Sequence, residues 1–260
     1  MTESTRTALC VGASGGIGFA AAKRLAREGV RVAIAARPGE RLEKALMELR
    51  QIRPDAEAIA LDAADPASRK AMFERIDERF GRLDILVNSV PGAAPISFVD
   101  HSLAHLEEGI TKKLIPYLDC MKMAFDRMKE RRWGRIINVV GIMWKEPEPG
   151  AFTLGVINAA LANAVKCAAL ELAPYGITVN NLHPGAILTE RLHNVWTRMA
   201  ELHGVTYEEV YNNKCAAIAA GRPGTPEEAA ALIAFLASEE AGYITGQQIA
   251  VDGGYTRSMI

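Results

Sequence analysis

The sequence predicts a single α/β domain built on a doubly wound parallel sheet. Apolar segments of strand length alternate with amphipathic segments of helical length along all 260 residues. No repeat or low-complexity linker interrupts this alternation, and a hydrophobic content of 49% suffices for one large core. Strands and helices that alternate in this way form parallel sheets whose crossover helices cover both faces. We therefore expect one domain over residues 1–260.

Each element follows from a local pattern. Apolar runs and two-residue alternation predict strands at 7–11, 30–35, 57–61, 83–88, 134–140, 178–182 and 247–251. Apolar faces at helical spacing predict helices at 19–29, 40–50, 66–80, 103–132 and 151–175, and a last helix that is capped by 221–228 and ends at Ser238. The helix 103–132 contains Pro116, whose ring clashes with the carbonyl group of Lys112. We therefore expect a kink near residues 112–113.

A glycine-rich turn joins the first strand to the first helix. It reads Val11-Gly12-Ala13-Ser14-Gly15-Gly16-Ile17-Gly18. Glycines at this place let the backbone turn tightly and approach a pyrophosphate, which then lies at the N–H groups and positive dipole end of the helix. The turn predicts a dinucleotide site, and a glycine turn without a ligand is the alternative for this motif alone.

The glycine spacing of this turn resembles the T-G-x-x-x-G-x-G motif of the short-chain dehydrogenase/reductase family, with Val11 in place of the threonine. Asn88 at the end of the fourth strand and the proline–glycine turn at 183–189 after the sixth match the same family. The resemblance covers nearly the whole chain. It implies a Rossmann-type domain, a nicotinamide cofactor, and a small-molecule carbonyl or alcohol substrate.

The resemblance also implies which residues hold the cofactor. They are Gly12, Ser14, Gly16, Ile17, Gly18, Arg37, Asp62, Asn88, Pro184, Gly185, Ile187 and Thr189. Arg37 ends the second strand, where an acidic residue would bond the ribose of NAD and an arginine accommodates the 2′-phosphate of NADP. Gly15 stands where a second basic residue of the turn would lie. Arg37 therefore favours NADP(H) over NAD(H), and a plain surface arginine is the alternative.

The family's catalytic positions hold other residue types in this chain. The family uses a tyrosine as general acid/base, a lysine that lowers its pKa, a serine that binds the substrate oxygen, and an asparagine on the kinked helix. A proton must move at oxygen when hydride moves at carbon, so these groups act together. The corresponding positions here are Leu154, Asn158, Gly141 and Lys113. The sequence thus predicts a divergent member that lacks the standard catalytic residues.

Three functions are compatible with these residues. The first is an NADP(H)-dependent oxidoreductase with acid/base residues from elsewhere, for which the candidates are Lys113, Lys145, Glu146, His101 and His105. The second is a nucleotide-binding pseudoenzyme that acts as a sensor or partner subunit, and the third is a binding protein without cofactor. The complete cofactor motifs favour the first. Lys113 is its leading candidate, because a desolvated lysine is a base near neutral pH; a solvated helix lysine is the alternative.

Other features predict the substrate lid, the oligomeric state, the partners and the location of the protein. Residues 189–220 resemble the family's variable substrate lid, and the two long helices resemble those that pair in its homotetramers or homodimers. A net charge of −1 without a basic patch excludes nucleic acid as a partner. Four scattered cysteines argue against a metal site. The polar start at 1–6 predicts neither signal peptide nor membrane anchor, and hence a cytoplasmic location.

Overall fold

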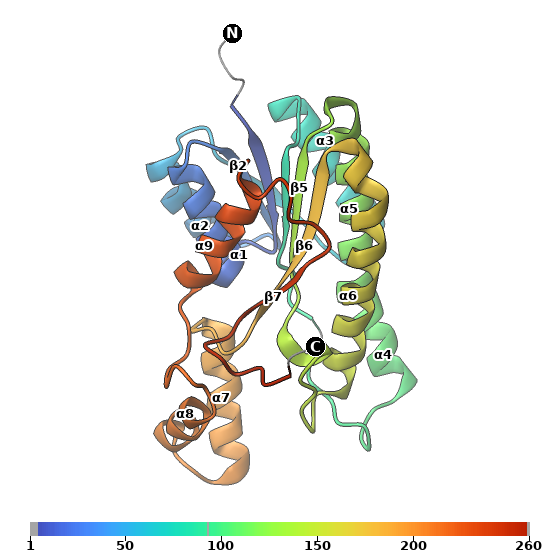
Figure 1. The fold of residues 1–260 in the computed structure, drawn as a ribbon. Helices are drawn as coiled ribbons and strands as arrows, with labels where there is room; N and C mark the ends of the chain where they lie inside the picture. Colours follow the sequence, from blue (N-terminus) through green and yellow to red (C-terminus); the bar gives the residue numbers. More distant parts are fainter. Residues whose placement is uncertain (1–4, 93, 259–260) are drawn as a thin grey trace.

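The computed structural model describes residues 5–92 and 94–258, which form a seven-stranded parallel sheet (Figure 1). The strands are β1 (Thr7–Val11), β2 (Arg31–Ala36), β3 (Glu57–Ala60), β4 (Ile85–Asn88), β5 (Gly134–Val139), β6 (Ile177–Pro184) and β7 (Gln248–Val251). Their order across the sheet is β3-β2-β1-β4-β5-β6-β7. The direction of winding reverses between β1 and β4, and ligands of such sheets bind at the carboxyl ends of the strands beside this point.

Helices cover both faces of the sheet (Figure 1). One face carries α1 (Gly16–Arg27), α2 (Glu40–Ile52) and α9 (Pro226–Ala237). The other face carries α3 (Pro66–Phe80), α5 (Ile115–Met128) and α6 (Phe152–Leu172). Beyond the carboxyl ends of the strands lie α7 (Glu190–His203) and α8 (Tyr207–Ala216), and short turns are η2 (Lys129–Arg131), η3 (Ile142–Trp144) and η4 (Ala173–Tyr175). The predicted doubly wound, Rossmann-type fold is confirmed.

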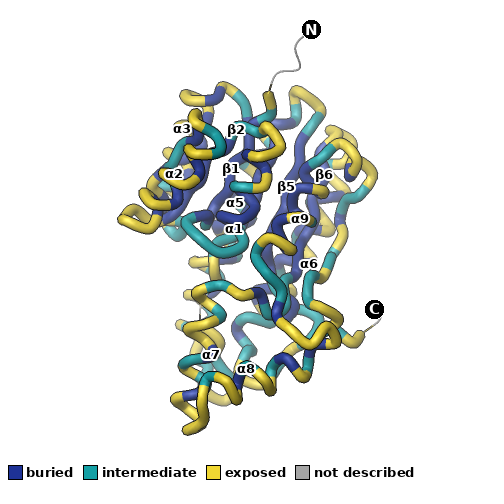
Figure 2. The backbone as a smooth tube through the Cα atoms, turned by 90° about the vertical axis from the view of Figure 1, so that its left-hand side faces the viewer, coloured by how far each residue is buried: buried dark blue, intermediate teal, exposed yellow. Residues whose placement is uncertain are grey.

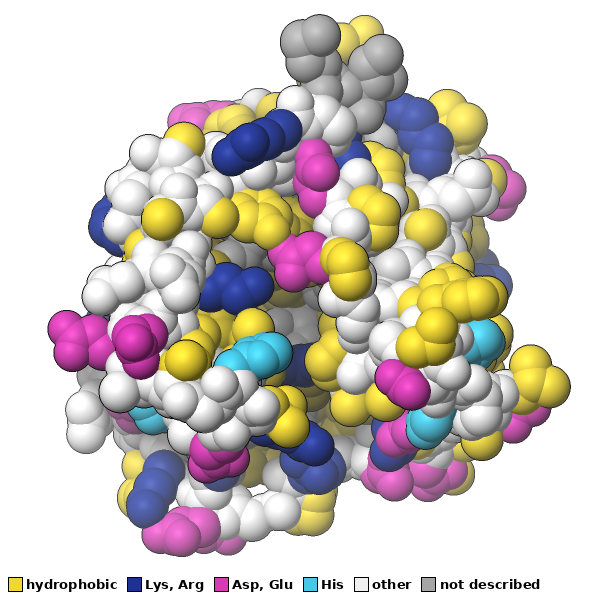
Figure 3. All heavy atoms as spheres, turned by 90° about the horizontal axis from the view of Figure 1, so that it is seen from below, with side chains coloured by type: hydrophobic (Ala, Val, Ile, Leu, Met, Phe, Trp, Pro, Cys, Tyr) yellow, Lys and Arg dark blue, Asp and Glu magenta, His cyan; other side chains and the backbone are white. Residues whose placement is uncertain are grey.

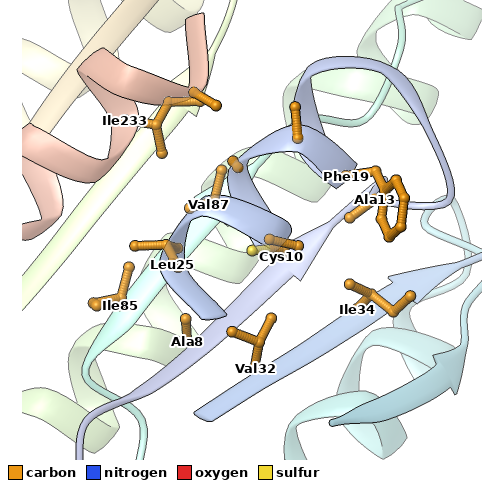
Figure 4. Close-up of a cluster of buried hydrophobic side chains, with 14 of the residues drawn as sticks. Ala8, Cys10, Ala13, Phe19, Leu25, Val32, Ile34, Ile85, Val87 and Ile233 are labelled. Carbon is orange, nitrogen blue, oxygen red and sulfur yellow. The ribbon is translucent and has the colours of Figure 1, made fainter. Parts of the chain in front are cut away.

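A buried apolar layer fixes the glycine turn to the sheet (Figure 4). Leu25 of α1 and Ile233 of α9 share one cluster with Cys10 of β1 and Val87 of β4, and each of these side chains is at most 1% exposed. Burial of one side chain of leucine size contributes roughly 1.5–3 kcal/mol. Because the glycine turn connects β1 directly to α1, this packing holds the turn in one place at the carboxyl end of β1.

Two predicted elements differ from those in the structure. β6 continues through Pro184, which was predicted to lie in a turn, because Pro184 pairs with Val251 at the end of the strand. The segment 189–220 divides into α7 and α8. Gly204 ends α7 in the left-handed region with φ of 64°, and Thr206 begins α8 with a capping box.

The predicted kink is confirmed as a π-helical turn. α4 (Leu103–Gly109) continues through the π turn η1 (Ile110–Leu114) into α5, and Pro116 lies in the first turn of α5. A wider turn keeps the proline ring away from the carbonyl groups that an α-helix would place against it. The π turn contains Lys112, which is exposed and paired with Glu108, and Lys113, which is buried.

α6 is the most apolar helix on its side of the sheet. Residues 152–175 have the length and the mean hydropathy, 1.4, of a helix that could cross a membrane. Core helices of soluble proteins share these properties, and Leu161 and Val165 of α6 are fully buried here. Figure 2 shows the buried strands at the centre, whereas α7 and α8 are largely exposed or half-buried.

Candidate active site

A cavity of about 1520 Å³ opens at the carboxyl ends of the strands. Figure 3 views this end of the molecule and shows a hollow with lysine and arginine side chains along its walls. The glycine turn lines one end of the cavity, and η3, the start of α6 and α7 line the other. Pockets for small ligands usually measure about 300–1,000 Å³, so this cavity has room for a dinucleotide together with a substrate.

The glycine turn lines the cavity at the start of α1. Gly12 has φ of 77°, and a Cβ atom there would lie 2.6 Å from the carbonyl oxygen of Ser89, so only glycine fits. Gly15 caps the helix without a side-chain hydrogen bond, and the first turn contains no acidic residue. The N–H groups of Gly12 and Ala13 bond the carbonyl oxygen of Ala35, whereas those at the start of α1 have no side-chain cap, and the helix dipole there favours a phosphate.

Two arginines lie at the end of the cavity beyond this turn. Arg37 is exposed, lines the cavity, and makes no hydrogen bond or ion pair with residues 5–92 and 94–258. Arg41 of α2 donates from Nε to the carbonyl oxygen of Ser14 at 3.3 Å, and its Nη2 lies 3.0 Å from Oε2 of Glu190. Arg41 is thus the second basic group that the glycine turn lacks. Sequence reasoning missed it, although its place four residues after Arg37 was a signal.

The structure brings most of the predicted cofactor residues together. Those that line the cavity are Gly12, Ser14, Gly16, Ile17, Arg37, Asp62, Pro184, Gly185, Ile187 and Thr189. Gly18 and Asn88 are not part of the lining. Gly18 allows close packing, since a Cβ atom there would lie 3.0 Å from the Gly12 carbonyl oxygen. Asn88 is buried, and its amide donates to Oδ1 of Asn138 at 2.9 Å.

Lys113 lies at the inner wall of the cavity, and only 4% of it is exposed. Its Nζ donates to the carbonyl oxygen of Val140 at 2.7 Å and to Oδ1 of Asn158 at 2.9 Å. Burial, followed by the positive charge of Arg191, lowers the pKa of Lys113 to about 7. This environment contradicts the alternative of a solvated helix lysine.

The other three catalytic positions of the family also lie at this wall. Leu154 and Asn158 are one turn apart on α6, and Gly141 follows β5. Gly141 has φ of 121°, and a Cβ atom there would lie 3.0 Å from Nδ2 of Asn158. A serine at this position would therefore be strained. His183 holds the same loop, because its Nδ1 is 2.7 Å from the carbonyl oxygen of Gly141.

The remaining acid/base candidates lie away from the cavity. His101 and His105 make local hydrogen bonds at the start of α4. Glu146 accepts hydrogen bonds from backbone N–H groups at 257–258, and Lys145 lies beside the ring of its neighbour Trp144. None of these four candidates lines the cavity, whereas Lys113 does.

α7 forms the outer wall of the cavity. Val195, Trp196 and Met199 line it with apolar surface, and Arg191 lines it from the first turn of the helix. Sequence reasoning did not select Arg191. Its place two residues after Thr189, at the start of the predicted lid, is the signal that could have found it.

The parallel sheet, the glycine turn and the cavity at the switch point agree with one family. A family profile described as enoyl-(acyl carrier protein) reductase matches residues 12–256. The chain belongs to the short-chain dehydrogenase/reductase family. Within it, the NADPH-dependent reductase BacG of Bacillus subtilis (strain 168) is 41% identical over 258 residues, which cover 98% of this chain and 100% of BacG.

Solved structures of this family superpose closely on the chain. YwfH, described as an NADPH-dependent reductase involved in bacilysin biosynthesis, has a TM-score of 0.94 at 40% identity, over 98% of this chain and 100% of YwfH. A variant of actinorhodin polyketide ketoreductase, solved with NADPH, has a TM-score of 0.93 at 29% identity, over 98% of each chain. The predicted family is confirmed, and the predicted preference for NADP(H) agrees with the cofactor that these descriptions name.

Proposed function

We propose that the protein is an NADPH-dependent reductase of a carbonyl compound and that Lys113 supplies the proton in place of the family's tyrosine. One observation carries this proposal: of the five acid/base candidates in the sequence, only Lys113 lines the cavity. Its pKa of about 7 suits proton transfer near neutral pH. The relatives described as NADPH-dependent reductases support the cofactor and the reaction type.

The cofactor end of the cavity fits NADPH. The unpaired N–H groups at the start of α1 suit the pyrophosphate, and Arg37 with Arg41 suits the 2′-phosphate. When bound, NADPH supplies the hydride. The nicotinamide would then lie beside Pro184, Gly185 and Thr189, because the corresponding positions of the family border it.

The hydrogen bonds of Lys113 suit both of its protonation states. An ammonium group has three N–H donors, and Val140 with Asn158 accepts two of them, so one N–H is left for a substrate oxygen. After that proton has moved, the neutral amine keeps both bonds and has a free electron pair. The carbonyl oxygen of the substrate becomes a hydroxyl group, and solvent restores the proton of the lysine.

Lys113 and Asn158 occupy exchanged positions. The family places asparagine on the kinked helix and lysine on the helix that corresponds to α6, whereas here lysine lies in η1 and asparagine on α6. Lys113 donates a hydrogen bond directly to Asn158. The site therefore has one cation and one amide, as the family's site does. Asn158 is a positioning residue in this proposal, and Leu154 leaves an apolar surface where the family has its phenol.

The test is the variant Lys113→Met, which removes the amine and keeps the length of the side chain. We expect NADPH-dependent reduction of a panel of ketones, aldehydes and oxo acids to fall by about 10²- to 10⁴-fold, the usual contribution of a general acid. Binding of NADPH, followed by its fluorescence, should change less than about twofold because Lys113 is not part of the cofactor end.

The matched control is Lys122→Met, which removes an exposed lysine of α5 that pairs with Asp126. It should leave both reduction and NADPH binding unchanged. Unchanged reduction in Lys113→Met would contradict the lysine mechanism. Tight binding of NADPH without reduction of any compound, in the unaltered protein, would favour the pseudoenzyme.

We further infer that the lid is formed by α7 and α8 and that the protein assembles through α5 and α6. α6 carries an outward apolar stripe of Val156, Cys167 and Leu170, of which Leu170 is 71% exposed. Family members pair the corresponding helices in dimers and tetramers. Light scattering should give a dimer or tetramer, and a monomer at micromolar concentration would contradict this assembly.

A further inference from the structure

The substrate end of the cavity contains a second cation without an anionic partner. Arg191 of α7 lines the cavity and makes no hydrogen bond or ion pair within the part of the chain that the structure describes. The neighbouring cations of the lining are paired: Lys112 with Glu108 and Lys214 with Glu148. Arg191 is exposed, so its donors are open to a ligand that enters the cavity, and the planar donor set of an arginine matches a carboxylate.

The first turn of α7 separates the two ends of the cavity. Glu190 turns toward the cofactor end, where it pairs with Arg41 at 3.0 Å. Arg191, the next residue, acts on the substrate end, since its charge lowers the pKa of Lys113. Arg191 and Lys113 also line the same cavity, so the charge of Arg191 acts on the space that the proton donor faces.

The rest of this wall is apolar. Val195 and Met199 follow Arg191 at helical spacing on the same face of α7, and Met143 of η3 and Leu154 of α6 line the cavity as well. A ligand of this region has a charged end at Arg191, a polar group at Lys113, and an apolar body against these side chains.

We propose that Arg191 binds a carboxylate of the substrate, so that the substrate class is oxo acids with an apolar body rather than uncharged ketones or thioesters. This inference depends on the proposed function only for the place of the carbonyl group at Lys113. A bound carboxylate also offsets the positive charge of Arg191, which otherwise lowers the pKa of Lys113. Lys113 is then more often protonated before the reaction and ready to donate. The competing assignment is that Arg191 binds the pyrophosphate of the cofactor.

The experiment compares 4-methylpentanoate with 4-methylpentanamide, a pair that differs in charge and lacks the reactive carbonyl. Calorimetric titration into the protein saturated with NADP⁺ should show the carboxylate binding about ten- to hundredfold more tightly, as for one charge-assisted hydrogen bond. Arg191→Gln should abolish this preference, Arg191→Lys should keep part of it, and the affinity for NADP⁺ should stay within about twofold in both.

The matched control is Arg198→Gln, which removes an exposed arginine from α7 outside the cavity lining and should keep the full preference. Equal binding of acid and amide by the unaltered protein would overturn the proposal. So would a preference that survives Arg191→Gln while the affinity for NADP⁺ falls, since Arg191 would then serve the cofactor. Because neither probe can be reduced, Lys113→Met should keep the preference, and failure of the lysine mechanism would leave this test unaffected.

In a second arm, 4-methyl-2-oxopentanoate and its methyl ester are offered with NADPH. The acid should have the higher kcat/KM by about tenfold or more, and Arg191→Gln should raise KM for the acid without changing that for the ester. If the ester and the acid had equal kcat/KM, this result would contradict a role of the carboxylate.

Discussion

The two ends of the cavity are built from different parts of the chain. At the proposed cofactor end, the backbone of the glycine turn and two exposed arginines form the lining. At the substrate end, buried or half-buried side chains from η1 and α6, Lys113, Leu154 and Asn158, form the wall. A backbone site survives as long as its glycines and strand order remain, whereas a side-chain site changes with each substitution. In the proposed function, this difference explains why the first end follows the family pattern and the second departs from it.

The strongest way to break this comparison is to remove a side chain from the cofactor end. Arg37→Gln should lower the affinity for NADPH by about tenfold or more, because the 2′-phosphate loses its unpaired cation. NADH lacks this phosphate, so its affinity should not change. Thermal unfolding offers the measurement: NADPH at a hundred times its Kd adds about 2.7 kcal/mol, and each kcal/mol raises Tm by roughly 2–4 °C.

The pair Arg37→Gln and Arg41→Gln shows which arginine the phosphate prefers. Arg41 already pairs with Glu190, so its loss should weaken NADPH binding less than the loss of Arg37. Equal Tm shifts by NADPH and NADH in the unaltered protein would contradict the role of both arginines.

The fold could be predicted because its signals are local. The glycine turn, the kink before Pro116 and the alternation of strands and helices each depend on a few neighbouring residues, and the structure confirms them. The predictions were wrong where the local structure depends on segments that are far apart in the sequence. Pro184 remains in β6 because β7, far along the chain, pairs with it.

The substrate end could be predicted only in part. The sequence indicated that Lys113 lies at the kink, but not that its amine reaches Asn158, because this contact joins two residues that are 45 positions apart in the chain. Arg41 and Arg191 were missed for the same reason: each lies on a helix, where an arginine is ordinarily a solvated surface residue. Arg41 faces the cavity because α2 lies beside the glycine turn in the fold. Arg191 faces it because α7 forms its outer wall.

The next prediction sharpens the substrate end through its pH dependence. Below pH 7 Lys113 carries the proton that reduction needs, and above pH 7 it does not. The kcat/KM for reduction should therefore be level at low pH and fall up to tenfold per pH unit above about 7, and oxidation of the product should show the reverse. Lys113→Arg keeps the charge but cannot give up the proton, so it should lose both activity and this profile.

The same shift predicts a change of stability with pH. Lys113 releases its proton at about 7 in the folded protein but at 10.5 when it is solvated, so the unfolded chain binds more protons between these values. The contribution of Lys113 to the free energy of unfolding therefore rises from pH 7 to 10.5. Lys113→Met should lack this rise when urea denaturation of the two proteins is compared. Parallel curves would show that the pKa of Lys113 is not lowered.

The smallest effect concerns the contact that joins the two ends. Glu190 of α7 pairs with Arg41 across the mouth of the cavity, and both side chains are more than half exposed, so the pair adds little stability. Glu190→Gln frees Arg41 for the 2′-phosphate and should raise the affinity for NADPH by about two- to fivefold, with no change for NADH. Glu201→Gln removes an exposed acid further along α7, and it should alter neither affinity. A weaker NADPH complex in Glu190→Gln would mean that Glu190 supports the cofactor end instead of competing for its arginine, and the lid would then belong to both ends of the cavity.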